Sequence, residues 1–350
     1  MLADIALVGF GNVARRFVRL LQERQDALVR DHDLKIRVAG IATLRHGAVH
    51  DASGIDAIRA AAIVESGGSL FELAAQPSTT RAASSGAVID ALASSVAPLR
   101  AVVETTTLDI QAGQPAIDHI RRALDCGCHA VTANKGPAAF AYRELTRVAA
   151  QRDLSFLFEG AVMDGIPVFN FVRETLPGVS IEGFRGIVNS TTNHILTALE
   201  DGEAFATALA HMQAEGIAEA DPSLDVQGWD AAAKAAALAN VFLDAGITPH
   251  DVNRSGVGPE TAGPARAARA RGHRLRLVAS AERGMRPSVR LVELPSDDLL
   301  AGLRGTANAL ILQTDTVGRI AIAQLDGALT HTAYALLSDL VTVRRRAERG

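Results

Sequence analysis

A strand, a glycine-rich turn and a helix follow one another at the start of this chain. A short apolar run leads into Gly9-x-Gly11-x-x-Ala14, and the next segment carries apolar residues at helical spacing. This order opens a β-α-β unit in which the first glycine permits a tight turn and the second lets phosphate approach the backbone. Asn12 and Val13 would then lie at the positive helix end. The motif predicts a dinucleotide site, although simple turn chemistry can also produce such glycines.

Strand and helix patterns alternate through the N-terminal half. Strands are expected at residues 36–42, 101–105 and 130–132, with a helix at 116–126 before the third. The Ala- and Ser-rich region 53–98 is helical in character. This alternation predicts a parallel sheet with helices on its faces.

The pattern changes after Pro167. Helices are then expected at residues 192–199, 204–216, 229–243 and 332–345, and strands at 179–188, 274–279, 288–294, 310–313 and 319–324. These strands predict a second, mixed sheet, after which the chain returns to a glycine turn and a long helix. We therefore expect an α/β fold: a Rossmann-type doubly wound parallel sheet from residues 1–160 plus 326–350. An α+β domain, residues 161–325, is inserted into it.

Composition excludes several classes of protein. At 350 residues the chain exceeds the size of one core, so two domains are expected. The net charge of −4 gives no basis for nonspecific nucleic-acid binding, and no apolar stretch is long enough for a membrane helix. Cys126 and Cys128 match neither a disulfide framework nor a CxxC motif, and the N-terminal run does not resemble a signal peptide. A cytoplasmic protein is expected.

The end of the second predicted strand bears on the choice of cofactor. NAD-binding chains usually place a carboxylate there, which binds the ribose hydroxyls. Here the strand runs into Thr43-Leu44-Arg45-His46, which contains no carboxylate, and Arg45 is suited to a 2′-phosphate. The sequence therefore favours NADP(H) over NAD(H).

Two further strand ends carry polar residues. Thr105 and Thr106 follow Glu104, at the edge where doubly wound sheets bind cofactor, although Thr is also simply a good strand residue. Lys135, in Thr-Ala-Asn-Lys-Gly-Pro, also follows a strand and could contact a reacting group. The alternative is a solvated surface lysine before a helix that begins at the proline.

Lysine is rare in this chain, with only Lys35, Lys135 and Lys234 among 35 basic residues. Arginine does not lose its proton near neutral pH, whereas a desolvated lysine can act as an acid or base. Asp230 and Lys234 are four residues apart, so they share a helix face. The plain reading is a surface ion pair of about 0.3–0.5 kcal/mol. That reading does not explain why lysine is used here.

Carboxylates are dense before this helix, with Glu219, Asp221 and Asp225 preceding Asp230. The segment 218–234, Ala-Glu-Ala-Asp-Pro-x-x-Asp-Val-x-Gly-x-Asp-Ala-Ala-x-Lys, resembles the signature of homoserine dehydrogenases. Residues 133–135, residues 186–196 and the N-terminal glycine turn are similar to that family too. The likeness covers roughly residues 1–340, in order and spacing.

The resemblance implies an NAD(P)-dependent interconversion of L-homoserine and L-aspartate 4-semialdehyde. It implies that Lys135 and Lys234 flank the reacting oxygen, with Lys234 as the proton donor and acceptor. Lys135 would also contact the cofactor. The inserted domain would bind substrate and form a homodimer. The developing alkoxide of such a reaction does need a proton and a nearby positive charge.

The same resemblance implies the substrate contacts. Glu219 would hold the substrate ammonium, Asp225 and Asp230 would orient the substrate and the lysine, and Thr191 would also contact the substrate. An α-amino acid substrate does require a carboxylate for its ammonium group. Neither a membrane nor a nucleic acid is expected as a partner.

Two loops depart from the family pattern. The family usually reads Gly-x-x-Gly-Gly-Gly-Ile-Pro where this chain has residues 159–167, with Asp164 among them. Oxygen ligands for a possible Na⁺ could still come from Glu159, Val162, Asp164 and Ile166. The C-terminal glycine turn, implied to bind cofactor, retains Gly327 in Leu-Asp-Gly-Ala-Leu. These changes keep two alternatives open: a same-fold dehydrogenase acting on a different small amino- or hydroxy-acid, or a catalytically inactive nucleotide-binding sensor.

Overall fold

The structure is a computed structural model that describes residues 1–214 and 221–348. The chain divides into two compact units. Unit 1 comprises Met1–Pro137, Ala141–Pro167 and Ala328–Gly350, and unit 2 comprises Ala138–Phe140 and Val168–Gly327. Each unit is built around a β-sheet of its own.

Unit 1 contains a seven-stranded sheet whose central strands are parallel. In spatial order these are β4 (Thr80–Arg81), β3 (Ala48–His50), β2 (Lys35–Ala42), β1 (Leu2–Val8), β5 (Leu99–Glu104), β6 (His129–Thr132) and β7 (Phe156–Leu157). Strand β1 pairs in parallel with β2 on one side and with β5 on the other. The chain order reverses there, which is where doubly wound sheets bind ligands. The predicted fold class is confirmed.

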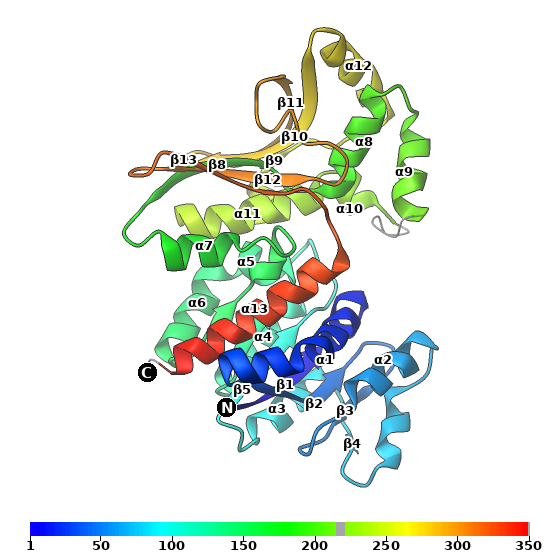
Figure 1. Ribbon diagram of the computed structural model, residues 1–350, viewed down its shortest axis with the longest axis vertical. Helices are drawn as coiled ribbons and strands as arrows, with labels where there is room; N and C mark the ends of the chain where they lie inside the picture. The colour runs from blue at the N-terminus through cyan, green and yellow to red at the C-terminus, as the bar shows by residue number, and fades with distance from the viewer. Residues whose placement is uncertain (215–220, 349–350) are drawn as a thin grey trace. The chain divides into compact units, whose positions relative to one another are not determined.

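Helices cover this sheet and complete its core. They are α1 (Asn12–His32), α2 (Ala57–Glu65), α3 (Ser85–Ala93), α4 (Ala116–Asp125), α5 (Lys135–Phe140), α6 (Tyr142–Gln151) and α13 (Leu329–Ala347), with 3₁₀ turns at Leu70–Ala75 and Glu159–Ala161. Helix α1 buries Phe17, Leu20 and Leu28 from its predicted apolar face, each contributing about 1.5–3 kcal/mol. Figure 1 shows α13 lying beside α1, and α13 also contacts β5 and β6.

The region 53–98 is less uniformly helical than predicted. It contains α2, the first 3₁₀ turn and α3, but also strand β4, which was not predicted. Strand β3, which lies just before this region, was not predicted either. Both strands are too short to show an alternating pattern. They form because β3 pairs antiparallel with the edge of β2, and β4 pairs with β3 in turn. This is a long-range pairing without a local signal.

Unit 2 contains a six-stranded mixed sheet. Its order is β13 (Arg319–Gln324), β12 (Asn308–Thr314), β8 (Ile181–Ile187), β10 (His273–Glu282), β11 (Ser288–Pro295) and β9 (Asn253–Arg254). Its helices are α7 (Val168–Thr175), α8 (Ser190–Glu200), α9 (Phe205–Ala214), α10 (Ser223–Val226), α11 (Trp229–Leu243) and α12 (Ala262–Ala270), with 3₁₀ turns at Pro249–Asp251 and Pro259–Thr261. In residues 1–214 and 221–348, none of the helices has the length and apolar character to span a bilayer.

Helix α11 begins and ends at the residues predicted from sequence. Gly228 precedes it with φ of +78°, and a Cβ there would lie 2.4 Å from the carbonyl oxygen of Ser255. Only glycine fits that turn. The guanidinium of Arg254 stacks 3.5 Å from the Trp229 ring centroid, and its Nη1 donates to the Gln227 carbonyl at 2.6 Å. Burial lowers the pKa of Arg254. These contacts fix the start of α11.

A fully buried ion pair lies between α8 and β10. The Nη1 of Arg276 donates to Glu200 Oε1 at 2.6 Å, and both side chains have no exposed surface. Burial lowers the pKa of Arg276, while the Glu200 carboxylate opposes that shift. Three backbone carbonyls, of Leu275, Ala301 and Leu303, accept three of the other four guanidinium hydrogens. Such a pair is costly to break from one side only.

We expect Arg276→Met to destabilise unit 2 by about 3–5 kcal/mol, because the buried Glu200 carboxylate would lose its closest cation and be left with the more distant Arg274 Nε at 3.7 Å. The double variant Arg276→Met/Glu200→Leu should recover much of that loss. Calorimetric unfolding of both variants and the wild type measures the effect. A single variant no less stable than the double variant would contradict this account.

Candidate functional site

The first candidate site lies where β1 and β5 end in unit 1. Gly9 has φ of +87°, and a Cβ there would lie 2.6–2.7 Å from backbone atoms of Thr105 and Thr106. Glycine is therefore required for the two strand ends to approach. The Thr105 hydroxyl donates to the Gly9 carbonyl at 2.9 Å, so this threonine joins the two ends directly.

The second glycine of the motif, Gly11, is not required by close packing. Gly11 is the N-cap of α1, and a Cβ built on it meets no atom within 4 Å. The fold alone does not need glycine at this position, whereas a phosphate approaching the backbone does. Asn12 and Val13 begin the helix behind it, and Ala14 is fully buried. The arrangement fits a pyrophosphate at the N-terminus of α1.

The turn between β2 and β3 presents Arg45 to solvent. It is shaped by Thr43, whose hydroxyl donates to the Gly47 carbonyl at 3.0 Å and accepts the His46 N–H at 2.7 Å. Leu44 is 99% exposed at its tip, and Arg45 is also exposed. Residues 43–47 contain no carboxylate.

Glu104, at the end of β5, is completely buried and organises its neighbours. Its Oε1 accepts the Thr106 N–H at 2.8 Å and also the Thr106 hydroxyl. Its Oε2 accepts the Thr132 hydroxyl at 2.8 Å. Sequence reasoning gave Glu104 no role, because its partner on β6 is distant in sequence.

This network leads to Lys135. The Thr132 hydroxyl accepts the Asn134 N–H at 2.9 Å, and Asn134 donates to the Thr106 carbonyl at 2.9 Å. The Oδ1 of Asn134 accepts the Gly136 N–H at 2.8 Å, so Asn134 caps α5. Lys135 is the first residue of that helix and is partly buried. The helix therefore begins at Lys135 rather than at Pro137, and the lysine is only partly exposed to solvent.

The second candidate site lies wholly in unit 2, around Lys234. Its Nζ is 3.0 Å from Asp230 Oδ2 and donates to the Val188 carbonyl at 2.6 Å. The two charged side chains are only 12% and 13% exposed, so this is not a solvated surface pair. Burial of this kind strengthens the interaction between the charges. A lysine held by a carboxylate and a carbonyl can donate a proton as the ammonium, and receive one as the neutral amine, at a fixed place.

Asn189 joins this cluster and was not assigned a role from sequence. Its Nδ2 donates to Asp225 Oδ1 at 2.7 Å and to Asp230 Oδ2 at 2.9 Å. It follows β8 directly and caps α8, through an Oδ1 that accepts the Thr192 N–H at 2.8 Å. The sequence signal is an asparagine between a strand and a helix, which alone indicates only a cap.

The other predicted substrate and cofactor residues are placed as follows. Thr191 is buried in the first turn of α8. Gly327 lies in unit 2, where a Cβ would be 3.8 Å from the Ser190 hydroxyl at the start of that helix. Glu219 lies outside the described residues.

The turn after β7 holds the residues considered for a cation, namely Glu159, Val162, Asp164 and Ile166. Glu159 is 3% exposed, and its N–H donates to Asp339 Oδ2 at 2.9 Å. Asp164 has φ of +50° and accepts the Thr332 hydroxyl at 3.2 Å. In the described part of the chain, no group of three or more His, Cys, Asp or Glu could hold a metal. A cation would depend on backbone carbonyls in addition to Glu159.

Comparison with known proteins gives one family over both units. A sequence model of the homoserine dehydrogenase family matches residues 167–341. The chain is 36% identical to an NAD(+)-dependent homoserine dehydrogenase from Pseudomonas canavaninivorans, over 99% of this chain and 97% of that protein. It is 34% identical to a homoserine dehydrogenase from Methanocaldococcus jannaschii, over 97% and 98% respectively.

A solved structure shows the same likeness in three dimensions. A hyperthermophilic archaeal homoserine dehydrogenase in complex with NADPH matches with a TM-score of 0.78 and 27% identity. The match covers 98% of each chain. The similarity therefore includes both the dinucleotide-type sheet and the unit that carries Lys234.

Proposed function

The chain belongs to the homoserine dehydrogenase family, and from this premise we propose that it interconverts L-homoserine and L-aspartate 4-semialdehyde. A nicotinamide dinucleotide, when bound, would supply the hydride in one direction and accept it in the other. The observation that carries the proposal is the partly buried cluster of Lys234, Asp230, Asn189 and Asp225. A nucleotide sensor would need only the strand-end site of unit 1.

Lys234 is the proton donor and acceptor in this proposal. Hydride addition to the aldehyde carbon leaves negative charge on the carbonyl oxygen, which takes up a proton. Asp230 and the Val188 carbonyl hold the ammonium in place. In the reverse direction the neutral amine removes the hydroxyl proton of homoserine. Lysine suits this role because its pKa can be tuned, whereas that of arginine cannot.

The other assignments follow the family resemblance. Lys135 serves chiefly as a fixed positive charge, on a helix start fixed by the Asn134 cap. Glu219 holds the substrate ammonium, and Asp225 and Thr191 contact the substrate. The chemistry requires carboxylates for this purpose, because an amino-acid ammonium is strongly hydrated and must be paired when it is buried.

We expect Lys234→Arg to lower kcat by about 100-fold or more, because arginine keeps the charge but cannot give up its proton. Lys135→Arg should retain more activity. Lys35→Arg is the matched control, since Lys35 is exposed at the start of β2. Steady-state kinetics with homoserine, on variants shown to be folded, measures the effect. Near-normal turnover of Lys234→Arg would leave Lys135 as the acid–base candidate.

The cofactor preference is a separate proposal. One relative is named as NAD(+)-dependent, and one related structure is a complex with NADPH. The exposed Arg45 and the lack of a carboxylate in its turn support NADP(H) for this chain. A guanidinium binds a phosphate through charge-assisted hydrogen bonds, and a ribose hydroxyl gains much less from it.

Arg45→Ala should raise the KM for NADP⁺ by about 10-fold or more, the scale of one charge-assisted hydrogen bond, and change the KM for NAD⁺ little. Arg24→Ala, at an exposed position on α1, is the control. Both constants come from initial-rate kinetics at saturating homoserine. Equal changes for the two cofactors would show that Arg45 does not meet the 2′-phosphate.

A monovalent cation at Glu159 is also part of the proposal. Hard cations take oxygen ligands, and this turn offers the Glu159 carboxylate with the carbonyls of Val162, Asp164 and Ile166. The nearby Asp339 carboxylate adds negative charge to the same buried turn. Na⁺ binding here stays a prediction.

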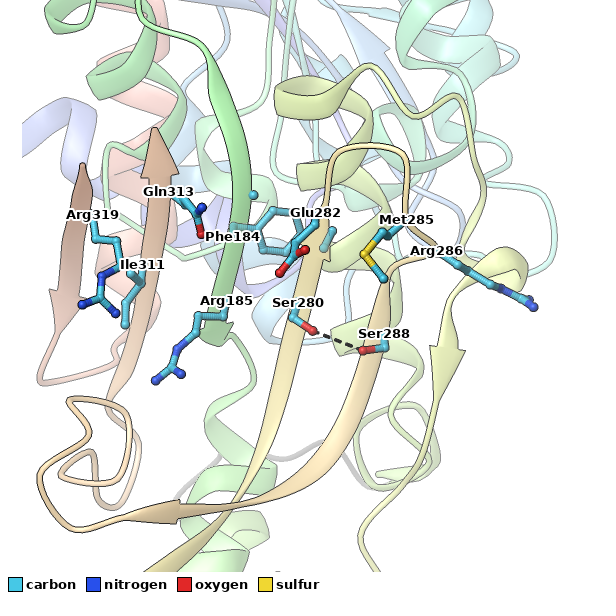
Figure 2. Close-up of a pocket in the computed structure, with 12 residues that line it drawn as sticks. Phe184, Arg185, Ser280, Glu282, Met285, Arg286, Ser288, Ile311, Gln313 and Arg319 are labelled. Atoms are coloured by element: carbon cyan, nitrogen blue, oxygen red, sulfur yellow. Dashed lines mark hydrogen bonds between the residues drawn. The ribbon is translucent and has the colours of Figure 1, made fainter. Parts of the chain in front are cut away.

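A homodimer through the sheet of unit 2 is proposed as well. Arg185 pairs in register with Ser280 and Ile311, and Ser280 with Ser288, so these side chains share one sheet face. They line an open depression of about 290 Å³ (Figure 2). The depression also carries Glu282 and Arg319, so its charges can complement those of a second copy. Helices α8 and α11 contact the same sheet.

The expected particle in sedimentation equilibrium is a dimer of the 36.7 kDa chain. Val292→Glu should shift it towards monomer, because Val292 is 36% exposed on β11 and alternates onto the face of Ser288. Val96→Glu, in unit 1 and 97% exposed, is the control and should stay dimeric. A monomeric wild type would contradict the dimer, and a dimeric Val292→Glu would place the contact elsewhere.

A further inference from the structure

We propose that Asn189 is a positioning residue for the reaction: its side-chain amide bridges Asp225 and Asp230 and thereby fixes the carboxylate that anchors Lys234. The inference rests on the proposed function, since it concerns the same acid–base lysine. It assigns to Asn189 a task beyond capping α8.

The orientation of the Asn189 amide is determined by its surroundings. Its Oδ1 accepts two hydrogen bonds from Thr192, from the N–H at 2.8 Å and from the hydroxyl at 2.9 Å. Its Nδ2 faces Asp225 and Asp230. The reversed orientation would set an oxygen against two carboxylates and an NH₂ against an N–H. One orientation therefore satisfies every partner.

The two carboxylates need this donor because they approach the same nitrogen. Their oxygens lie within two hydrogen-bond lengths of each other, so they repel unless a donor stands between them. Each bond from Asn189 favours the ionised form of the carboxylate that accepts it. Asp230 Oδ2 is shared between Asn189 and the Lys234 ammonium, so its position sets the position of the lysine.

A helix cap alone would not call for asparagine. Ser, Thr and Asp cap helices about as well, and this chain uses Asp56 on α2 and Ser84 on α3 for that purpose. Among the favoured capping residues, asparagine combines the capping oxygen with two N–H donors on one rigid group. The side chain meets both demands at once here.

The test uses Asn189→Ser and Asn189→Asp, since both keep an oxygen for the cap. Ser removes the two donors without adding charge, and Asp also places a third carboxylate in the cluster. We expect kcat to fall by about 10–100-fold for Ser, the scale of a small misplacement of a catalytic group, and further for Asp. Ser84→Ala, which loses a cap on α3, should keep wild-type kcat.

A second readout does not depend on turnover. Because the chain has three lysines, ¹³Cε-lysine labelling gives three NMR signals, and the Lys234→Arg variant identifies the one from Lys234. Asp225 and Asp230 already place negative charge beside this lysine, and a further carboxylate in Asn189→Asp should raise the pKa of Lys234. The pH profile of homoserine oxidation, which needs the neutral amine, should move to higher pH with it.

The outcomes separate the two proposals. A folded wild type without homoserine turnover overturns the proposed function, while the lysine titration still reports on Asn189. Wild-type kcat in Asn189→Ser, together with an unmoved Lys234 titration in Asn189→Asp, shows that Asn189 is only a cap and overturns this inference. Asn189→Thr, which also caps and adds no charge, replaces Asn189→Ser if that variant fails to fold.

Discussion

Each candidate site is built around a carboxylate with little or no contact with water: Glu104 is completely buried, and the Asp230 side chain is 13% exposed. A buried carboxylate is tolerated only when donors or cations surround it, so its position dictates where neighbouring groups must lie. In unit 1, Glu104 draws Thr106 and Thr132 to the ends of β5 and β6. In unit 2, Asp230 draws Asn189 and Lys234 together from two different elements. The polar geometry of each site follows from this one requirement.

Helix α8 is held at both ends by such groups. Its cap, Asn189, belongs to the lysine cluster, and its last residue, Glu200, pairs with the buried Arg276. A helix with fixed ends has little freedom to rotate or slide. The amide of Asn189 and the preceding Val188 carbonyl are thereby presented by a rigid element rather than by a loop. Preorganisation of this kind favours transfer of a proton over a short, constant distance.

Sequence patterns predicted those parts of the two sites whose residues are close together in the chain. The glycine spacing located the switch between β1 and β5, and the four-residue spacing of Asp230 and Lys234 gave their shared helix face. Asn189 and Glu104 could not be found this way. Asn189 meets Asp225 and Asp230, 36 and 41 residues further along the chain, and the hydroxyl that Glu104 accepts from β6 is 28 residues away. Such contacts exist only after strands pair.

The chain uses arginine for a permanent buried charge and lysine where a charge could be gained or lost. Arg276 is buried where a permanent charge with several planar donors satisfies Glu200 and three carbonyls at once. A lysine there would leave acceptors unfilled, since it has a single nitrogen. Position 234 differs: a compact ammonium lies against the Asp230 carboxylate and the Val188 carbonyl. An arginine would fill that space with donors that never release a proton. The use of lysine rather than arginine at this position therefore supports the proposal that Lys234 transfers the proton.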